Sequence, residues 1–118
     1  KRACAESRQQ VPDSIAQIAA VIYNSLAECY ASTVKEIEGL THKNYEYIHI
    51  VGGGANAGYL NELTANATRK TVYAGPTEAT AIGNIASQMI ADGKLKDLKA
   101  ARRCIFDSFE IKEYNPDL

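Results

Sequence analysis

Three consecutive glycines, Gly52-Gly53-Gly54, separate two segments of opposite periodicity. Residues 45–51, YEYIHIV, are rich in β-branched and aromatic side chains, which favours a strand that ends at the glycines. Residues 57–69 then carry Leu60, Leu63 and Ala67 at helical spacing. Glycines at such a turn let the backbone approach a ligand, and the start of the following helix offers N–H groups to a phosphate. The alternative is a plain strand-to-helix turn without a ligand.

Residues 13–40 predict one long helix with a buried side. Pro12 and Asp13 form its expected start, because proline is excluded from a helix interior and an Asp oxygen can accept from a free N–H. The helix needs another element against its apolar face, since isolated helices are marginal in water. That face is expected to hold Ile15, Ile18, Ile22, Leu26, Cys29, Ile37 and Leu40, widened by Ala19, Tyr30 and Val34.

A second strand and a third helix are expected after the glycine-containing unit. Residues 71–74 predict a short strand that ends at Gly75-Pro76. Residues 77–92 predict a helix with Thr77 as its N-cap, and Gly93 is suited to the position just past its end.

The remaining residues complete an α/β pattern. Residues 94–104 predict a short amphipathic helix, and residues 109–118 predict an edge strand or an extended tail. The second half of the strand at 45–51 is apolar on both faces, as expected in a sheet covered on both sides. Strands linked by helices imply parallel crossovers. We therefore expect an α/β fold, with a small parallel-containing sheet and flanking helices, in one compact unit.

Composition excludes several classes of function. The 118 residues include 13 Lys plus Arg and 14 Asp plus Glu, and this net charge of -1 speaks against nucleic acid or an anionic membrane as a partner. No apolar run approaches the roughly 18 residues of a membrane span, so no transmembrane segment is expected, and the first residues lack the apolar stretch of a signal peptide. The first residues also lack an initiator Met, so the chain is expected to start within a longer protein. Three cysteines without a CxxC pair predict reduced thiols in the cytoplasm and no zinc site.

His49 is expected to be packed with one hydrogen bond, and neither it nor His42 has a partner at metal-site or nucleophile spacing.

The glycine run matches some known phosphate-binding patterns better than others. A P-loop would end in Gly-Lys-Ser/Thr, which Gly54-Ala55-Asn56 does not provide. A dinucleotide pattern, G-x-G-x-x-A, is formally present from Gly52 to Ala57, with Glu78 near the distance of a ribose-binding acid. That acid should end the second strand, whereas Glu78 follows Gly75-Pro76 and opens a helix. A truncated Rossmann-type domain of an oxidoreductase and a non-catalytic interaction module stay open as alternatives.

Residues 48–88 resemble the C-terminal domain of the FGGY carbohydrate kinases. The resemblance rests on the glycine loop after a strand, on the L-N-x-L-T-A helix at residues 60–65, and on V-x-A-G-P-x-E-A-T at residues 72–80, which leads into Ile82-Gly83-Asn84. The long preceding helix and the Tyr114-Asn115-Pro116 tail also fit, so the resemblance covers nearly the whole chain. Within the family, the likeness is greatest to members that phosphorylate L-rhamnulose.

The resemblance implies an actin-like ATPase (ribonuclease H-like) fold, with residues 1–118 as part of a C-terminal nucleotide-binding domain. It implies phosphorylation of L-rhamnulose at its 1-hydroxyl with ATP and Mg²⁺. Gly53 is the first residue implied to meet the nucleotide, with Gly52 and Gly54 in support and Asn56 near the adenosine; residues 78–84 would pack beside that cleft. The family's catalytic Asp and its sugar-binding residues belong to an N-terminal domain without a counterpart here. No catalytic or metal-binding residue is therefore assigned, and the chain alone is expected to be inactive.

Overall fold

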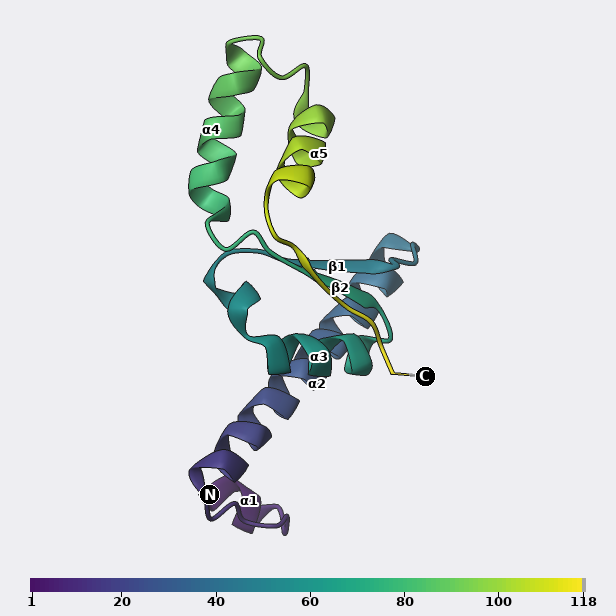
Figure 1. Ribbon diagram of the computed structural model, residues 1–118. Helices are drawn as coiled ribbons and strands as arrows, with labels where there is room; N and C mark the ends of the chain where they lie inside the picture. The colour runs from purple at the N-terminus through teal and green to yellow at the C-terminus, as the bar shows by residue number, and fades with distance from the viewer. Residues whose placement is uncertain (118) are drawn as a thin grey trace.

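The computed structural model describes residues 1–117, so Leu118, the last residue of the predicted tail, lies outside the described residues (Figure 1). The helices are α1 (Arg2–Glu6), α2 (Ile15–Thr41), α3 (Gly58–Thr68), α4 (Ala79–Ala91) and α5 (Leu98–Ser108), with a 3-10 turn at Gly53–Asn56. The strands are β1 (Tyr47–Ile50), β2 (Thr71–Ala74) and β3 (Lys112–Tyr114). None of the helices within residues 1–117 is both long enough and apolar enough to cross a membrane.

The molecule is elongated. Its principal extents are 60 × 34 × 26 Å and its radius of gyration is 18.0 Å, whereas a compact domain of this length has a radius of about 13.5 Å. The sheet lies in the middle, the hairpin of α4 and α5 projects from one side, and α1 and the first half of α2 project from the other (Figure 1). The prediction of one compact unit is therefore wrong.

The sheet has the order β1-β2-β3, with β1 and β2 parallel and β3 antiparallel at the edge beside β2. The predicted small sheet with a parallel pair is confirmed, as are the bounds of β2 and the edge strand near the C-terminus. β1 is shorter than predicted, because the backbone N–H of Tyr45 donates to Glu38 Oε1 (2.9 Å) instead of a neighbouring strand.

One face of the sheet is covered and the other is open in the part of the chain that the structure describes. Val72 and Ala74 of β2 are buried beneath α3, whose Ala65 is fully buried. On the opposite face, Tyr73 contacts the rings of Tyr47, His49 and Phe106. The expectation that β1 is covered on both faces is therefore wrong. His49 is exposed and stacks on Tyr73 with ring centroids 5.4 Å apart, rather than being packed with a hydrogen bond.

Helix α2 buries a side that overlaps the predicted one only in part. It begins after Ser14, whose hydroxyl accepts from the N–H of Gln17 (3.2 Å), so Ser14 and not Asp13 is the cap. The predicted stripe stays largely exposed, with Ile15 at 87% and Leu40 at 83%. The side that contacts α3 follows Tyr23, Ala27, Ala31 and Val34, of which only Val34 belongs to the predicted face. The small side chains of Ala27 and Ala31 allow α3 to approach closely.

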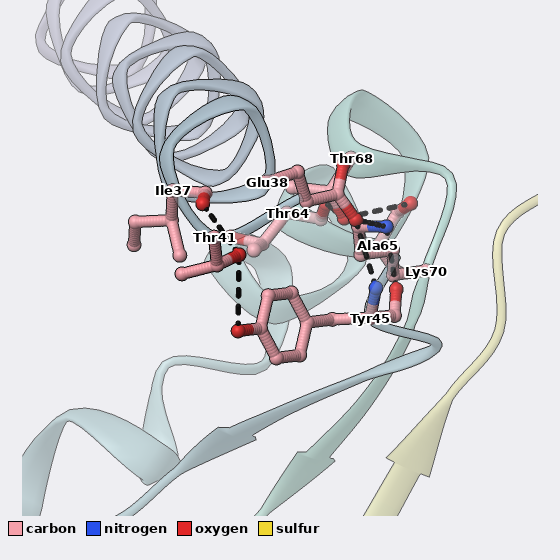
Figure 2. Close-up of polar contacts among 8 residues, drawn as sticks. All are labelled: Ile37, Glu38, Thr41, Tyr45, Thr64, Ala65, Thr68 and Lys70. Atoms are coloured by element: carbon pink, nitrogen blue, oxygen red, sulfur yellow. Dashed lines mark hydrogen bonds and ion pairs between the residues drawn. The ribbon is translucent and has the colours of Figure 1, made fainter. Parts of the chain in front are cut away.

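The C-terminal end of α2 is joined to the starts of β1 and β2 by one polar cluster (Figure 2). Lys70 Nζ forms an ion pair with Glu38 Oε1 (2.7 Å) and also donates to the carbonyl of Tyr45. The Tyr45 hydroxyl donates to Thr41 Oγ1 (3.3 Å). The hydrogen bond from Lys70, together with the N–H of Tyr45, lowers the pKa of Glu38 below its ordinary value. The cluster anchors α2 at the end of the sheet opposite the glycine loop.

Helices α4 and α5 both start later than predicted. Helix α4 begins at Ala79 with Glu78 at the N-cap position and no side-chain cap. The hydroxyl of Thr77, the predicted cap, lies one residue before this position and donates to Asn56 Oδ1 (3.3 Å). The end of α4 before Gly93, which has a φ of +72°, agrees with the prediction. Helix α5 begins after Asp97, whose carboxylate accepts from the N–H of Ala100 (2.8 Å).

Candidate functional site

The glycine loop follows β1 at the carboxyl end of the parallel pair. Gly52 has a φ of +80° and a ψ of −166°, a backbone region that only glycine adopts readily. The next residues form the 3-10 turn, in which the N–H of Ala55 donates to the carbonyl of Gly52 (3.0 Å). A Cβ built on any of the three glycines would meet no atom within 4 Å. The outer side of the loop is therefore open to a ligand.

Two backbone hydrogen bonds join the loop to the turn after β2. The N–H of Gly52 donates to the carbonyl of Pro76 (3.0 Å), and the N–H of Gly75 donates to the carbonyl of Ile50 (2.8 Å). The amides of Gly53 and Gly54 differ, because they have no acceptor within residues 1–117. The predicted site residues thus divide into Gly52, which shapes the loop, and two glycines whose N–H groups remain available.

Asn61 holds the loop from inside and was not predicted as a site residue. Its Nδ2 donates to the carbonyl of Ala55 (3.0 Å), and its side chain is 1% exposed. The bond satisfies both a buried amide and a carbonyl of the 3-10 turn, which stabilises the loop conformation. The sequence gives no clear signal for this role, because Asn61 lies off the predicted apolar face of Leu60, Leu63 and Ala67, and the buried face of α3 also holds the polar Thr64.

A hollow of about 280 Å³ opens beside the loop. Three segments form it: the end of the 3-10 turn, the turn and helix start after β2, and the segment that leads into β3. Asn56 lies at this hollow and accepts the hydrogen bond from Thr77, while Gly52, Gly53 and Gly54 do not line it. The lining residues are Ala55, Asn56, Ala74, Gly75, Pro76, Thr77, Glu78, Ile82, Phe109, Glu110 and Lys112.

The charges at the hollow come from Glu78, Glu110 and Lys112. Over the described stretch 1–117, no three His, Cys, Asp or Glu side chains gather as they would around a metal ion. Free amides at a turn, one ammonium group and nearby acceptors form an arrangement that can bind an anionic ligand with hydroxyl groups.

An α/β sheet with a glycine loop at the carboxyl end of its parallel strands defines a class of nucleotide-binding domains. The family model "FGGY family of carbohydrate kinases, C-terminal domain" matches residues 2–91. The chain belongs to this family, and its fold is that of the actin-like ATPases.

Curated relatives agree with the family. The chain is 48% identical to the rhamnulokinase of Bacillus subtilis (strain 168) over 113 residues, which cover 96% of this chain and 23% of that protein. It is 44% identical to the rhamnulokinase of Halalkalibacterium halodurans over 114 residues, and 47% identical to that of Enterococcus faecalis over 117 residues. The chain spans about a quarter of the length of these relatives, at 23% to 24%.

The alternatives left open by the sequence are not favoured. Glu78 lies at the start of α4, four residues after the end of β2, and not at the end of a strand as a ribose-binding acid in a Rossmann domain would. The family match covers the same residues and identifies a carbohydrate kinase domain rather than an oxidoreductase or an interaction module.

Proposed function

We propose that this chain provides the ATP-binding part of a carbohydrate kinase that phosphorylates L-rhamnulose at its 1-hydroxyl. Membership of the FGGY family supports the reaction class, and the names of the relatives support the sugar. The observation that carries the proposal is the pair of free amides at Gly53 and Gly54, at the start of a turn beside an open hollow.

The loop would bind the nucleotide through its backbone. Gly53 and Gly54 would donate N–H groups to phosphate oxygens, where backbone donors and the dipole of the turn favour negative charge. Gly52 would contribute its conformation, because its own N–H is already bonded to Pro76. Asn56 would meet the adenosine, since its amide group lies at the hollow next to the loop.

Phosphoryl transfer needs groups beyond these. Mg²⁺, which in such enzymes is held largely by the nucleotide phosphates, would neutralise charge on the transferred group. The catalytic Asp and the sugar site would belong to an N-terminal domain, with residues 1–118 as part of the C-terminal one. The three cysteines are free thiols, which supports the proposal of a cytoplasmic protein.

A titration of the isotopically labelled chain with Mg·ATP, and separately with NAD, tests the proposed site by amide NMR. Glycine amides resonate in a sparse spectral region, so those of Gly52, Gly53 and Gly54 report even weak binding. Shifts confined to this loop with ATP and absent with NAD are expected. Shifts with NAD alone would contradict the proposal in favour of a dinucleotide site, and a spectrum unchanged by Mg·ATP would show that this chain has no nucleotide site of its own.

A further inference from the structure

The segment that closes the hollow lies outside the family match. The family model ends at residue 91, yet Phe109, Glu110 and Lys112 form one wall of the hollow. This wall approaches the turn after β2 very closely: a Cβ built on Gly75 would lie 2.7 Å from the carbonyl oxygen of Glu110. Glycine at position 75, with a φ of +128°, permits this contact. The segment before β3 is thus packed against the proposed nucleotide site.

Lys112 is held at this wall by strand pairing. It is opposite Ala74 in the β2–β3 register, and paired residues of neighbouring strands point to the same face of a sheet. Ala74 is buried and lines the hollow, so the side chain of Lys112 starts from the face that carries the glycine loop.

The tail beyond β3 is fastened to α3, which follows directly from the loop. Asn66 Nδ2 donates to Asp117 Oδ2 (2.8 Å), and the N–H of Asp117 donates to Asn66 Oδ1 (2.7 Å). Arg69 Nη1 donates to the carbonyl of Asp117 (2.6 Å). Together with the pairing to β2, these bonds fix both ends of the short strand that presents Lys112.

Charge distinguishes Lys112 from the other residues of the hollow. It is the one cationic residue among the lining residues within 1–117, and no carboxylate of that range lies within ion-pair distance of its Nζ. Glu78 and Glu110, the two carboxylates of the hollow, would repel phosphate but can accept hydrogen bonds from hydroxyl groups. A ligand that carries both phosphate and sugar hydroxyl groups matches this set of one cation and two hydrogen-bond acceptors.

We propose that Lys112 is a further nucleotide-binding residue, which contacts a phosphate group of ATP opposite the amides of Gly53 and Gly54. This inference rests on the proposed function. It extends the nucleotide site to a segment beyond the family match, and it gives the site a full positive charge where the loop alone has only partial charges.

The test compares Lys112→Met and Lys112→Arg with Lys99→Met, a matched control on an exposed face of α5 that does not line the hollow. Dissociation constants for Mg·ATP and for adenosine are measured by amide NMR, after the dispersion of the amide signals has shown that each variant is folded. Loss of one charge-assisted contact is expected to weaken Mg·ATP binding by Lys112→Met about tenfold and to leave adenosine within about twofold. Lys112→Arg should restore much of the affinity, and Lys99→Met should match the unaltered chain.

The outcomes separate this inference from the proposed function. Unchanged Mg·ATP binding by Lys112→Met, or an equal loss for Mg·ATP and adenosine, overturns the role of Lys112 while the nucleotide site stands. If the unaltered chain gives no shift with Mg·ATP, the proposed function fails and this inference fails with it.

Discussion

At the glycine loop, single residues determine the backbone path. Gly52 has a conformation that other residues reach only with strain, and Asn61 holds the carbonyl of Ala55 from inside the protein. Gly53 and Gly54 have no such constraint, and their N–H groups have no acceptor within residues 1–117. The three adjacent glycines therefore differ in their structural requirements.

Replacement of Gly52 by Ala should destabilise the chain, whereas Gly54→Ala should not. The φ of +80° at Gly52 makes an alanine there cost about 1–3 kcal/mol in the free energy of unfolding. Gly54 has space for a Cβ and no positive φ, so its replacement should change stability by less than about 1 kcal/mol. Urea denaturation of both variants checks this expectation. Equal stabilities would show that the loop relaxes into another conformation.

Asn61→Ala should make the glycine loop less stable, although Asn61 itself lies in α3. The substitution leaves the carbonyl of Ala55 without its donor and should cost about 1–3 kcal/mol in the free energy of unfolding. Hydrogen exchange of the amides of residues 53–57 should accelerate. The control is Asn84→Ala, because Asn84 is exposed and bonds only to Thr80 of its own helix. An effect of Asn84→Ala as large as that of Asn61→Ala would contradict a specific role for Asn61.

At the scale of elements, polar contacts attach the C-terminal end of α2 to the sheet. Glu38, Tyr45 and Lys70 join α2 to the starts of both parallel strands (Figure 2). Lys70 and Glu38 are only 11% and 22% exposed at their side chains. The ion pair is therefore less accessible to water than an ordinary surface pair. Its loss should weaken the attachment of α2 to the sheet.

The stability of the chain should depend on the ionisation of Glu38. Because its pKa is lowered in the folded state, the carboxylate stabilises the fold above its ordinary pKa of 4.5, and this contribution is lost as the pH falls through the lower folded value. Urea midpoints measured from pH 6 to pH 3 should fall less steeply for Glu38→Gln than for the unaltered chain. Glu36→Gln, at an exposed position on the same helix, should follow the unaltered chain. Parallel curves for Glu38→Gln and the unaltered chain would refute the coupling.

At the scale of the whole molecule, the chain is an open assembly rather than a closed globule. Large apolar residues stay exposed along α2, and the aromatic face of the sheet is uncovered in the described residues. The hollow is likewise formed from one side only, by the end of the 3-10 turn, the turn after β2 and the segment that leads into β3. Phosphoryl transfer requires groups that hold the sugar hydroxyl in line with the phosphate, and this arrangement does not provide them.

The purified chain should therefore show no rhamnulose kinase activity. With Mg·ATP and L-rhamnulose, release of ADP should equal that of a blank without protein. The rhamnulokinase of Bacillus subtilis serves as the positive control in the same assay. ADP release that requires L-rhamnulose and increases with the concentration of this chain would contradict the prediction.

Local sequence was sufficient wherever neighbouring residues decide the structure. The strand at 71–74, the glycine turn and the end of α4 before Gly93 follow from side-chain branching and backbone freedom, which act over a few residues. The resemblance of residues 48–88 likewise pointed to the family that the comparisons confirm.

Tertiary contacts decided the rest. The side of α2 that is buried follows the small residues that face α3, a choice that helical periodicity alone does not make because several apolar stripes run along α2. Thr77 does not cap α4, which has Glu78 at its N-cap position, and its hydroxyl donates instead to Asn56, 21 positions earlier in the sequence. Lys112 lines the hollow because β3 pairs with β2, which lies far from it in the sequence, and a local pattern contains no information on such a meeting. Asn61 bonds to Ala55 only six residues away, but its burial depends on the packing of α3 against α2 and the sheet. The sequence by itself determined the elements and the glycine loop, and the tertiary structure determined which side chains complete the site.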